Sequence, residues 1–444
     1  MKRLVWLLAA PLFSSPLWAA DLVQIYRDAQ ANDATFAAAK ATLEAGRERL
    51  PQGRAGLLPV LSLSANSFYN RNEISEHNGP TLYKPNYNSN GYTLTLTQPL
   101  FRWQNWIAYD QSKYQVAQAE ANFVQAGQDL ILRTAQAYFD VLYAIENLKA
   151  IRANKTAIEQ QLESAKKNFE VGTATIIDSQ EAQARFDLAT AQEIGAENDV
   201  VVKKRVLEAI IGKEAGELAP VRRDAQMSPP QPADIQKWAA AAESDSINVQ
   251  LQQAALAIAS GEVSRQRAGH YPTVDLVANK GTSTTFGSTG LGMLETNFEN
   301  VGVQLNLPIF QGGAVVSRQS EASANRAASE ANLEAARRNS ALSARQNYLG
   351  VVNGLAQVRA LRAALVSSQS SLESTRLGFE VGVRINIDVL NAENQVYVTR
   401  RDLAKAALDT IIAQFRLKAA VGTLSDDDVI AANTLLDSTA VSQQ

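Results

Sequence analysis

Two patterns of apolar and polar positions alternate along this chain, one with the period of a helix and one with the period of a strand. Two long stretches, residues 102–169 and 311–379, contain no proline and carry apolar side chains at alternating spacings of four and three. This spacing predicts a coiled-coil seam on helices that would each be roughly 100 Å long. The seam positions are Ala137, Val141, Ala144, Leu148 and Ile151 in the first stretch, and Tyr348, Val351, Leu355 and Val358 in the second.

Other helices must accompany the long pair, because a lone helix of that length cannot bury its seam. Helical patterns of suitable length cover residues 22–52, 177–211, 234–267 and 386–421. We therefore expect a bundle in which these helices run beside the two long ones.

Four shorter stretches alternate at every second residue, which predicts strands with one apolar and one polar face. We expect these strands at about residues 60–69, 91–100, 272–280 and 300–309. The segments between the paired strands, residues 70–90 and 281–299, are rich in Gly, Asn, Ser and Thr, which indicates exposed loops.

Aromatic residues gather near the ends of the predicted strands. They would either form the interfacial belt of a membrane barrel or pack a soluble junction between strands and helices. These residues are Phe68, Tyr69, Tyr92, Phe101, Trp103, Trp106, Tyr271 and Phe310.

The whole series of elements occurs twice. The turn Phe169-Glu-Val-Gly172 returns as Phe379-Glu-Val-Gly382, and Gln98-Pro-Leu-Phe101 returns as Leu307-Pro-Ile-Phe310. Because the matches keep their order, we infer two tandem repeats with an offset of roughly 210 residues. The predicted divisions are a first repeat at 21–227, a Pro-rich linker at 228–233, a second repeat at 234–424 and a C-terminal tail at 425–444.

The first twenty residues are typical of a secretory signal peptide, with Lys2 and Arg3 before a short apolar stretch and small residues at Ala19 and Ala20. Cleavage would follow Ala19 or Ala20. No later stretch is apolar over the length that a spanning helix needs. The mature chain is therefore either exported and soluble or inserted into a membrane as β-structure.

Composition excludes several classes of function. The chain has no cysteine, so it has neither disulfides nor thiol chemistry. Its formal charge is −3 and it has no basic stripe, which argues against nucleic-acid binding. His77 and His270 lack metal-ligand spacing, and no catalytic motif is complete. We expect no enzyme activity, no cofactor and no metal, and we interpret Asp426–Asp428 as a solvated run near a helix start.

Four strands with one apolar face cannot enclose a polar lumen, and a bilayer tolerates no open sheet edge. A closed barrel of several chains would remove both difficulties, and two or three copies would suffice. A proline lies near each junction between strand and helix, where a lost backbone N–H is tolerated. These junction residues are Pro59, Pro99, Pro272 and Pro308.

Taken together, the signal peptide, the duplicated unit, the paired glycine turns and two further motifs resemble the TolC family of outer-membrane channel-tunnels. The two motifs are Pro308-Ile-Phe-Gln-Gly-Gly313 and Asp388-Val-Leu-Asn-Ala-Glu393. The resemblance implies an α+β membrane protein that forms a homotrimer. It also implies a twelve-stranded β-barrel, with four strands per chain, continuous with a long α-helical coiled-coil barrel in the periplasm.

The same resemblance implies a function and partners. The chain would be the exit duct of tripartite efflux pumps and type I secretion systems in the Gram-negative outer membrane. Its partners would be outer-membrane lipid, a periplasmic adaptor (membrane fusion) protein and an inner-membrane efflux pump or ABC exporter. The alternative from another class is a soluble periplasmic coiled-coil scaffold or adaptor.

The resemblance also implies a gate after the second glycine turn. Its acidic ring would fall on Asp388, while Asn391 replaces the second acid of the ring. Links between the hairpins would involve Arg384 and Asp178, and the family's Tyr and hydroxyl positions are here Phe379 and Ile177. The turn residues would cap helices and contact the adaptor; they are Val171, Gly172, Thr173, Val381, Gly382 and Val383.

Overall fold

The computed structural model describes residues 19–437, apart from residues 76, 84–85, 174, 223–226 and 287–291. Most of the predicted signal peptide, part of the predicted loop 281–299 and the last residues of the predicted tail therefore lie outside the described residues. The chain divides into two compact units. The hairpin unit comprises Met1–Ala39, Val124–Ser246 and Arg338–Gln444, and the strand unit comprises Lys40–Phe123 and Ile247–Arg337.

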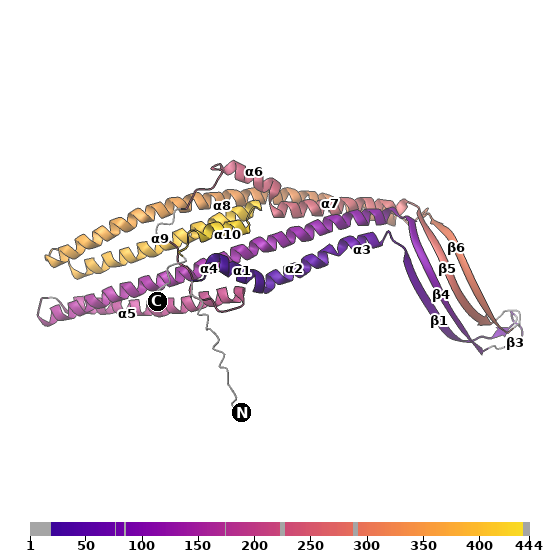
Figure 1. Ribbon diagram of the computed structural model, residues 1–444, viewed down its shortest axis with the longest axis horizontal. Helices are drawn as coiled ribbons and strands as arrows, with labels where there is room; N and C mark the ends of the chain where they lie inside the picture. The colour runs from indigo at the N-terminus through magenta and orange to yellow at the C-terminus, as the bar shows by residue number, and fades with distance from the viewer. Residues whose placement is uncertain are drawn as a thin grey trace, which may run out of the picture. The chain divides into compact units, whose positions relative to one another are not determined.

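Two long helical hairpins make up much of the hairpin unit. Helix α4 (Trp103–Glu170) is followed by α5 (Ile176–Ile211), and α8 (Ala314–Glu380) is followed by α9 (Asn386–Val421). Figure 1 shows the two helices of each pair running side by side. The turn glycines, Gly172 and Gly382, have φ angles of 79° and 80°. Glycine adopts this left-handed conformation without steric cost, so it ends each long helix.

The main core of the hairpin unit lies where α4, α5 and α9 meet the short helices α1 (Leu22–Asn32) and α10 (Asp426–Asn433). Tyr138 and Phe139 are fully buried there, and their rings meet edge to face with centroids 5.5 Å apart. The Tyr138 hydroxyl donates a hydrogen bond to the carbonyl oxygen of Ala219 at 2.8 Å. Burial raises the pKa of this hydroxyl, so Tyr138 remains a neutral donor.

The coiled-coil seams predicted on the two long helices are confirmed. On α8 the seam packs with helix α6 (Ile235–Asp245) and with the end of α9, in a cluster that includes Trp238, Val351 and Leu417. The alternating spacing of apolar residues by four and three positions thus predicted which face each helix buries. The buried seam residues are Ala137, Val141, Ala144, Ile151, Val351 and Val358, while Leu148, Tyr348 and Leu355 are half-buried.

The opening helices predicted as unbroken, over residues 22–52 and 234–267, are both interrupted. The first is divided into α1, α2 (Ala34–Arg47) and α3 (Arg49–Ala55). Between α1 and α2, the Asp33 carboxylate accepts hydrogen bonds from the backbone N–H of Phe36 at 2.6 Å and from Arg133 at 3.1 Å. Side-chain bonds of this kind compete with helical ones.

The second opening helix is divided at Ser246 into α6 and α7 (Ile247–Arg267). The Ser246 hydroxyl donates a buried hydrogen bond to the hydroxyl of Ser340 on α8, at 2.9 Å. The partner lies far away in the sequence, so the periodicity of residues 234–267 gave no sign of the break.

The segment predicted as a C-terminal tail contains helix α10. Ser425 and Asp428 form a capping box at its start. The acidic run does begin a helix, as expected, but it is not simply solvated. Asp428 is buried and bonds to Lys418, and Asp426 accepts a hydrogen bond from the Tyr26 hydroxyl at 2.8 Å.

Four antiparallel strands form the main sheet of the strand unit, in the order β1-β4-β5-β6. The strands are β1 (Val60–Arg71), β4 (Asn86–Phe101), β5 (Thr273–Phe286) and β6 (Met293–Asn306). A small second sheet pairs β2 (Ile74–Ser75) with β3 (Thr81–Tyr83), and the 3-10 helix η1 (Ala268–His270) precedes β5.

All four predicted strands are present, but they extend further into the predicted loops than expected. The loop prediction for residues 281–299 is wrong for much of its length, because Thr282 pairs with Asn297 and Thr284 pairs with Glu295 in the ladder. Threonine favours strands, and cross-strand bonds between polar side chains, such as Ser67 to Asn90 at 2.7 Å, satisfy the polar positions.

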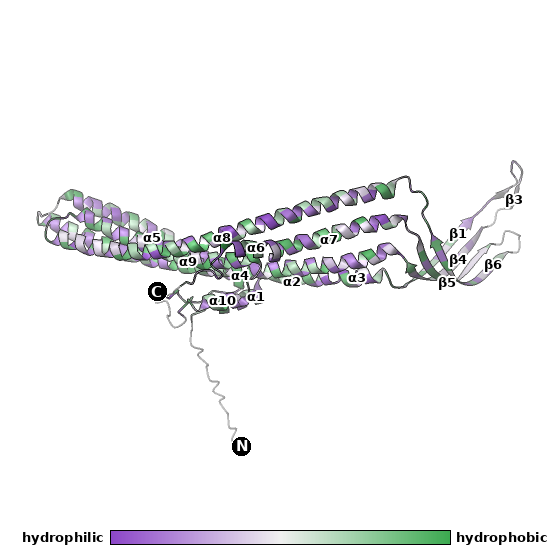
Figure 2. Ribbon diagram, turned by 90° about the horizontal axis from the view of Figure 1, so that it is seen from above, coloured by the Kyte–Doolittle hydropathy of each residue, from purple (hydrophilic) through white to green (hydrophobic). Residues whose placement is uncertain are grey.

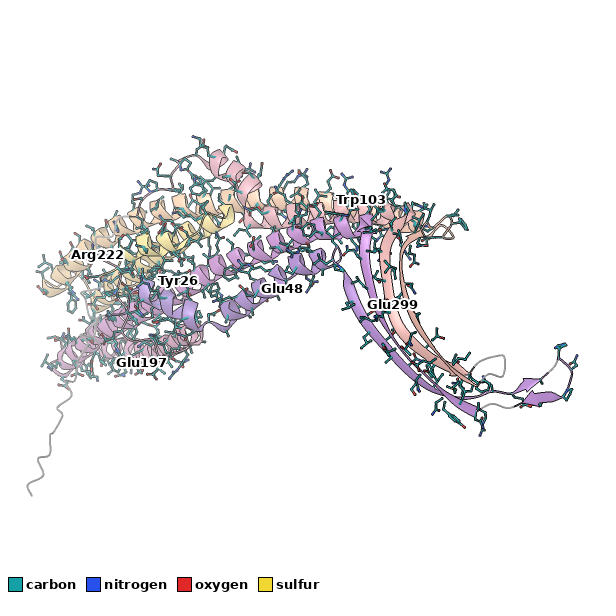
Figure 3. The ribbon with its side chains drawn as sticks, turned by 45° about the vertical axis from the view of Figure 1, so that its right-hand side comes forward. Tyr26, Glu48, Trp103, Glu197, Arg222 and Glu299 are labelled. Carbon is teal, nitrogen blue, oxygen red and sulfur yellow. The ribbon has the colours of Figure 1, made fainter. Side chains whose placement is uncertain are left out.

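One face of the main sheet is apolar near the helical end of the strands. Cross-strand neighbours on this face form the row Leu61, Leu96, Ala278 and Val301. Val301 is 75% exposed in the single chain. The next row on the same face contains the ion pair of Lys280 and Glu299, the latter labelled in Figure 3. The apolar stretch of this face therefore ends at a charged row.

The opposite face of the sheet is polar. The Thr95 hydroxyl donates a hydrogen bond to the Asn279 side chain at 2.8 Å, and Asn279 donates to Asn300 at 3.0 Å. The alternation predicted for the strands is therefore present in the sheet. Along the helices, Figure 2, which colours the chain by hydropathy, shows hydrophobic and hydrophilic residues intermingled.

Of the four predicted junction prolines, Pro59 and Pro272 directly precede β1 and β5, and Pro308 lies two residues after the end of β6. Pro99 instead lies inside β4, at an irregularity in its pairing with β5. Just beyond β4, Arg102 donates two hydrogen bonds to the buried carboxylate of Asp275, at 2.8 and 2.7 Å. This pair ties the end of β4 to β5 and was not predicted.

One expectation about hydropathy needs correction. An 18-residue window within α8 reaches a mean hydropathy of 1.2 with few charges, so by length and composition one described helix is apolar enough to cross a membrane. Only 11% of that window is buried in the single chain.

Candidate functional site

The ends of the two hairpins expose apolar side chains around the turn glycines. Val171 is 72% exposed and Val383 is 76% exposed. The two turns share one pattern of backbone bonds, in which the residue after the glycine donates to a carbonyl five residues earlier: Thr173 to Asn168 and Val383 to Gly378. Both tips are thus capped by backbone hydrogen bonds and carry apolar groups that the single chain does not bury.

On the second hairpin, Arg384 lies next to the predicted ring residue Asp388. Arg384 Nη1 lies 3.6 Å from Asp388 Oδ2, and both side chains are partly exposed, at 61% and 34%. Asp388 lies in the first turn of α9, where the helix dipole favours a negative charge. Gly378 makes room for the arginine, because a Cβ atom there would lie 2.8 Å from Arg384 Cγ.

On the first hairpin, Asp178 serves as part of a helix cap. Its carboxylate accepts hydrogen bonds from the backbone N–H and the hydroxyl of Thr175, at 3.0 and 2.7 Å. Among the described residues, Arg384 therefore pairs with Asp388 and not with Asp178. The described residues of the single chain show no contact between Arg384 and Asp178, so this link between the hairpins stays a prediction.

The remaining predicted gate residues differ in exposure. Ile177 is 67% exposed, and Phe379 is half-buried at the end of α8. Asn391 is exposed on α9, one turn after Asp388.

A contact that the sequence analysis missed joins the two hairpins. Arg185 on α5 donates a hydrogen bond from Nη2 to Oδ1 of Asn391 on α9, at 2.9 Å. Gln161 on α4 also donates to the side chain of Asn386 on α9. Arg185 is the only basic residue between positions 168 and 202, but nothing in the sequence indicated its partner on α9.

Apolar packing supports this contact. Ile158, Ala189 and Leu390 form a buried cluster, against which Phe186 packs from α5. These residues come from α4, α5 and α9, so the cluster joins the first hairpin to the second. Close by, Arg376 on α8 donates a hydrogen bond to Glu393 on α9 at 2.6 Å. This bond links the two helices of the second hairpin.

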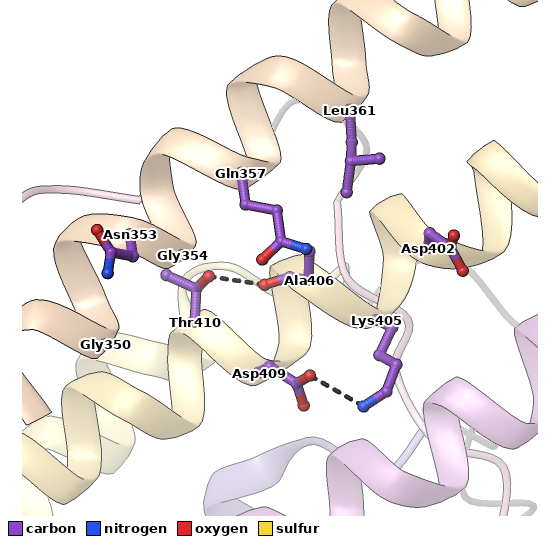
Figure 4. Close-up of a pocket in the computed structure, with 10 residues that line it drawn as sticks. All are labelled: Gly350, Asn353, Gly354, Gln357, Leu361, Asp402, Lys405, Ala406, Asp409 and Thr410. Carbon is purple, nitrogen blue, oxygen red and sulfur yellow. Dashed lines mark hydrogen bonds and ion pairs between the residues drawn. The ribbon is translucent and has the colours of Figure 1, made fainter.

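A groove lies between α8 and α9, away from the tips (Figure 4). Its volume is about 430 Å³. Within it, Lys405 pairs with Asp409 at 3.0 Å. No group of His, Cys, Asp and Glu among the described residues is arranged to hold a metal ion. The lining residues are Gly350, Asn353, Gly354, Gln357, Leu361, Asp402, Lys405, Ala406, Asp409 and Thr410.

Comparison with known proteins agrees with this architecture. The sequence model of a family described as "Outer membrane efflux protein" matches residues 25–213 and 238–423, one match in each repeat. The chain is 31% identical over 438 residues to the outer membrane protein TolC of Vibrio cholerae serotype O1, covering 98% of each chain. It is 33% identical over 436 residues to TolC of Escherichia coli K12, covering 96% of this chain and 86% of that protein.

A third relative has a name that refers to secretion. The chain is 31% identical over 442 residues to the alkaline protease secretion protein AprF of Pseudomonas aeruginosa, covering 98% of this chain and 92% of the relative. Among solved structures, CusC has a TM-score of 0.78 at 16% identity and covers 91% of this chain and 92% of its own. This likeness shows that the fold is shared.

Proposed function

This chain belongs to the outer membrane efflux protein family, and from that premise we propose that three copies assemble into one gated channel. The protein is an outer-membrane exit duct and a conduit, not an enzyme. Channels of this family work together with other efflux or secretion components. The trimer, the gate and the contact with an adaptor are the parts that we propose.

The observation that carries the proposal is the main sheet, which has an apolar face and two edge strands, β1 and β6. Unpaired edges cannot face lipid, because their N–H and C=O groups would find no partners. Pairing β6 of one copy with β1 of the next satisfies both edges. With three copies, the closed barrel contains twelve strands and directs the row of Leu61 and Val301 toward lipid.

The helical tips provide the second part of the proposal. In a trimer, three copies of Asp388 would converge on the axis and form a ring that favours cations over anions. The exposed valines at the tips, Val171, Val381 and Val383, would contact a periplasmic adaptor whose helices cover them. The adaptor would connect the duct to an inner-membrane pump or ABC exporter.

The alternative hypothesis is a soluble periplasmic scaffold or adaptor, which the family membership does not favour. Membrane fractionation separates the two. We expect an oligomer in the outer membrane that dissociates on heating, with channel activity in planar lipid bilayers. Recovery of a monomer in the soluble periplasm would refute the proposal.

Efflux and secretion are distinguished by a deletion strain. Loss of the gene should increase drug sensitivity if efflux dominates, and should deplete specific exported proteins if type I secretion dominates. Measuring both in one strain identifies the cargo class of this duct.

A further inference from the structure

We propose that Arg185 and Asn391 form a clasp that holds the two hairpins of each chain together and opposes opening of the channel. This inference rests on the proposed channel function. It assigns to Asn391 a role other than that of a ring residue.

The clasp spans a long sequence distance but a short spatial one. Arg185 Nη2 lies 2.9 Å from Asn391 Oδ1, and the two residues are 206 positions apart in the chain. Arg185 is on α5 and Asn391 is on α9, so the bond connects one hairpin to the other. Any motion that separates the hairpins at this level must break it.

The surroundings hold Arg185 in place. Its guanidinium also lies 3.7 Å from Glu181 Oε1, one turn earlier on α5. Beneath the bond, the buried side chains of Ala189 and Leu390 join the same two helices. The arginine is therefore oriented by a carboxylate of its own helix while it donates to the other hairpin.

The bond also changes what Asn391 offers to passing ions. A side-chain carbonyl oxygen that accepts a hydrogen bond from an arginine lies beside a positive charge, so it attracts cations weakly. Of the two predicted ring positions, only Asp388 therefore supplies a negative charge, and Asn391 contributes a mechanical restraint. A carboxylate at position 391 would pair with the guanidinium of Arg185. It would therefore strengthen the clasp and would add little to the negative field of the ring.

Single-channel recording in planar lipid bilayers tests the clasp. Arg185→Gln removes the charged donor and keeps a long side chain with good helix propensity. The ratio of open to closed time should rise about 3- to 150-fold, the range expected when one exposed charged bond is removed from each of three chains. Asn391→Ala removes the acceptor and should produce the same increase.

A matched control is available on the same helix. Arg205 pairs with Glu208 one turn away on α5, at 2.6 Å, and within the described part of the chain it makes no bond to the other hairpin. Arg205→Gln removes a similar charge and should leave the open-to-closed ratio unchanged. The yield of heat-sensitive oligomer shows that each variant is folded.

Asn391→Asp distinguishes the clasp from a ring. If the clasp is correct, the variant opens less often than the unmodified protein and gains no block by Mg²⁺. Block should appear when Arg185→Gln is added, because the carboxylates are then free. Mg²⁺ block in Asn391→Asp alone, or equal gating in Arg185→Gln and Arg205→Gln, would overturn the clasp. Absence of channels in the unmodified protein would instead refute the proposed function.

Discussion

Gly354 on α8 allows a close approach to α9, and replacing it provides a direct test of the packing between these helices. A Cβ atom on Gly354 would lie 2.5 Å from Thr410 Oγ1 and 3.3 Å from Thr410 Cβ. Thr410 is almost fully buried, and its hydroxyl donates to the carbonyl oxygen of Ala406 at 2.6 Å (Figure 4). Thr410 therefore has neither space nor a free rotamer with which to avoid an added methyl group.

Two terms determine the effect of Gly354→Ala on stability. Alanine favours the helix over glycine by about 0.5–1 kcal/mol. Overpacking a well-filled contact costs about 1–3 kcal/mol. Gly350, one turn earlier, isolates the first term, because a Cβ atom there would have no neighbour within 4 Å. The free energy of unfolding of Gly354→Ala should therefore be about 1–3 kcal/mol below that of Gly350→Ala.

Urea denaturation of the detergent-solubilised protein, followed by far-ultraviolet circular dichroism, measures this difference. Adding Thr410→Ala to Gly354→Ala removes the clashing hydroxyl and should recover part of the lost stability. Equal midpoints for Gly350→Ala and Gly354→Ala, at equal denaturant dependence, would show that α8 and α9 do not meet as described.

Three further predictions concern charges and hydrogen bonds. Arg384→Ala should raise single-channel conductance, since it removes the partner of Asp388, an exposed pair worth up to about 1 kcal/mol per chain; an unchanged conductance would contradict this. Burial raises the pKa of Asp33, but hydrogen bonds from Arg133 and from the backbone N–H of Phe36 lower it by a larger amount, so the net shift of the pKa is downward. Its stabilisation is therefore present above the unfolded pKa of about 3.9 and is lost as pH falls through the folded pKa. Asp33→Asn should unfold about 1–3 kcal/mol more easily at pH 7, and urea titrations should show this gap closing in acid. Tyr138→Phe should lower the free energy of unfolding by about 1–3 kcal/mol, because the carbonyl of Ala219 loses its buried donor.

The helical hairpins and the strands were predictable because their periodicity records which face each element buries. Val141 and Val351, for example, lie on seams that the spacing alone identified. The turn glycines were predictable for a different reason. A glycine after a helical pattern can adopt the left-handed conformation that ends a helix, and the repeat has such a glycine after each long helix, at Gly172 and at Gly382.

The breaks and the clasp were not predictable, because each depends on a partner far away in the chain. Asp33 meets Arg133 across 100 positions, and Ser246 meets Ser340 across 94. The bond from Arg185 spans 206 positions. Periodicity describes one segment at a time, so it could not show which polar side chains the fold would bring together.

The two unpaired edges of the main sheet have a consequence for how the protein reaches its membrane. A single chain that entered lipid would expose the edge groups of β1 and β6, so the monomer has no stable inserted state. With the three copies per barrel that we propose, insertion becomes a collective step whose rate rises steeply with the local concentration of chains. Before that step, each chain travels with an exposed apolar face on its sheet. Biogenesis should therefore depend on periplasmic chaperones that cover this face, and on the rate of synthesis more than on the intrinsic stability of one chain.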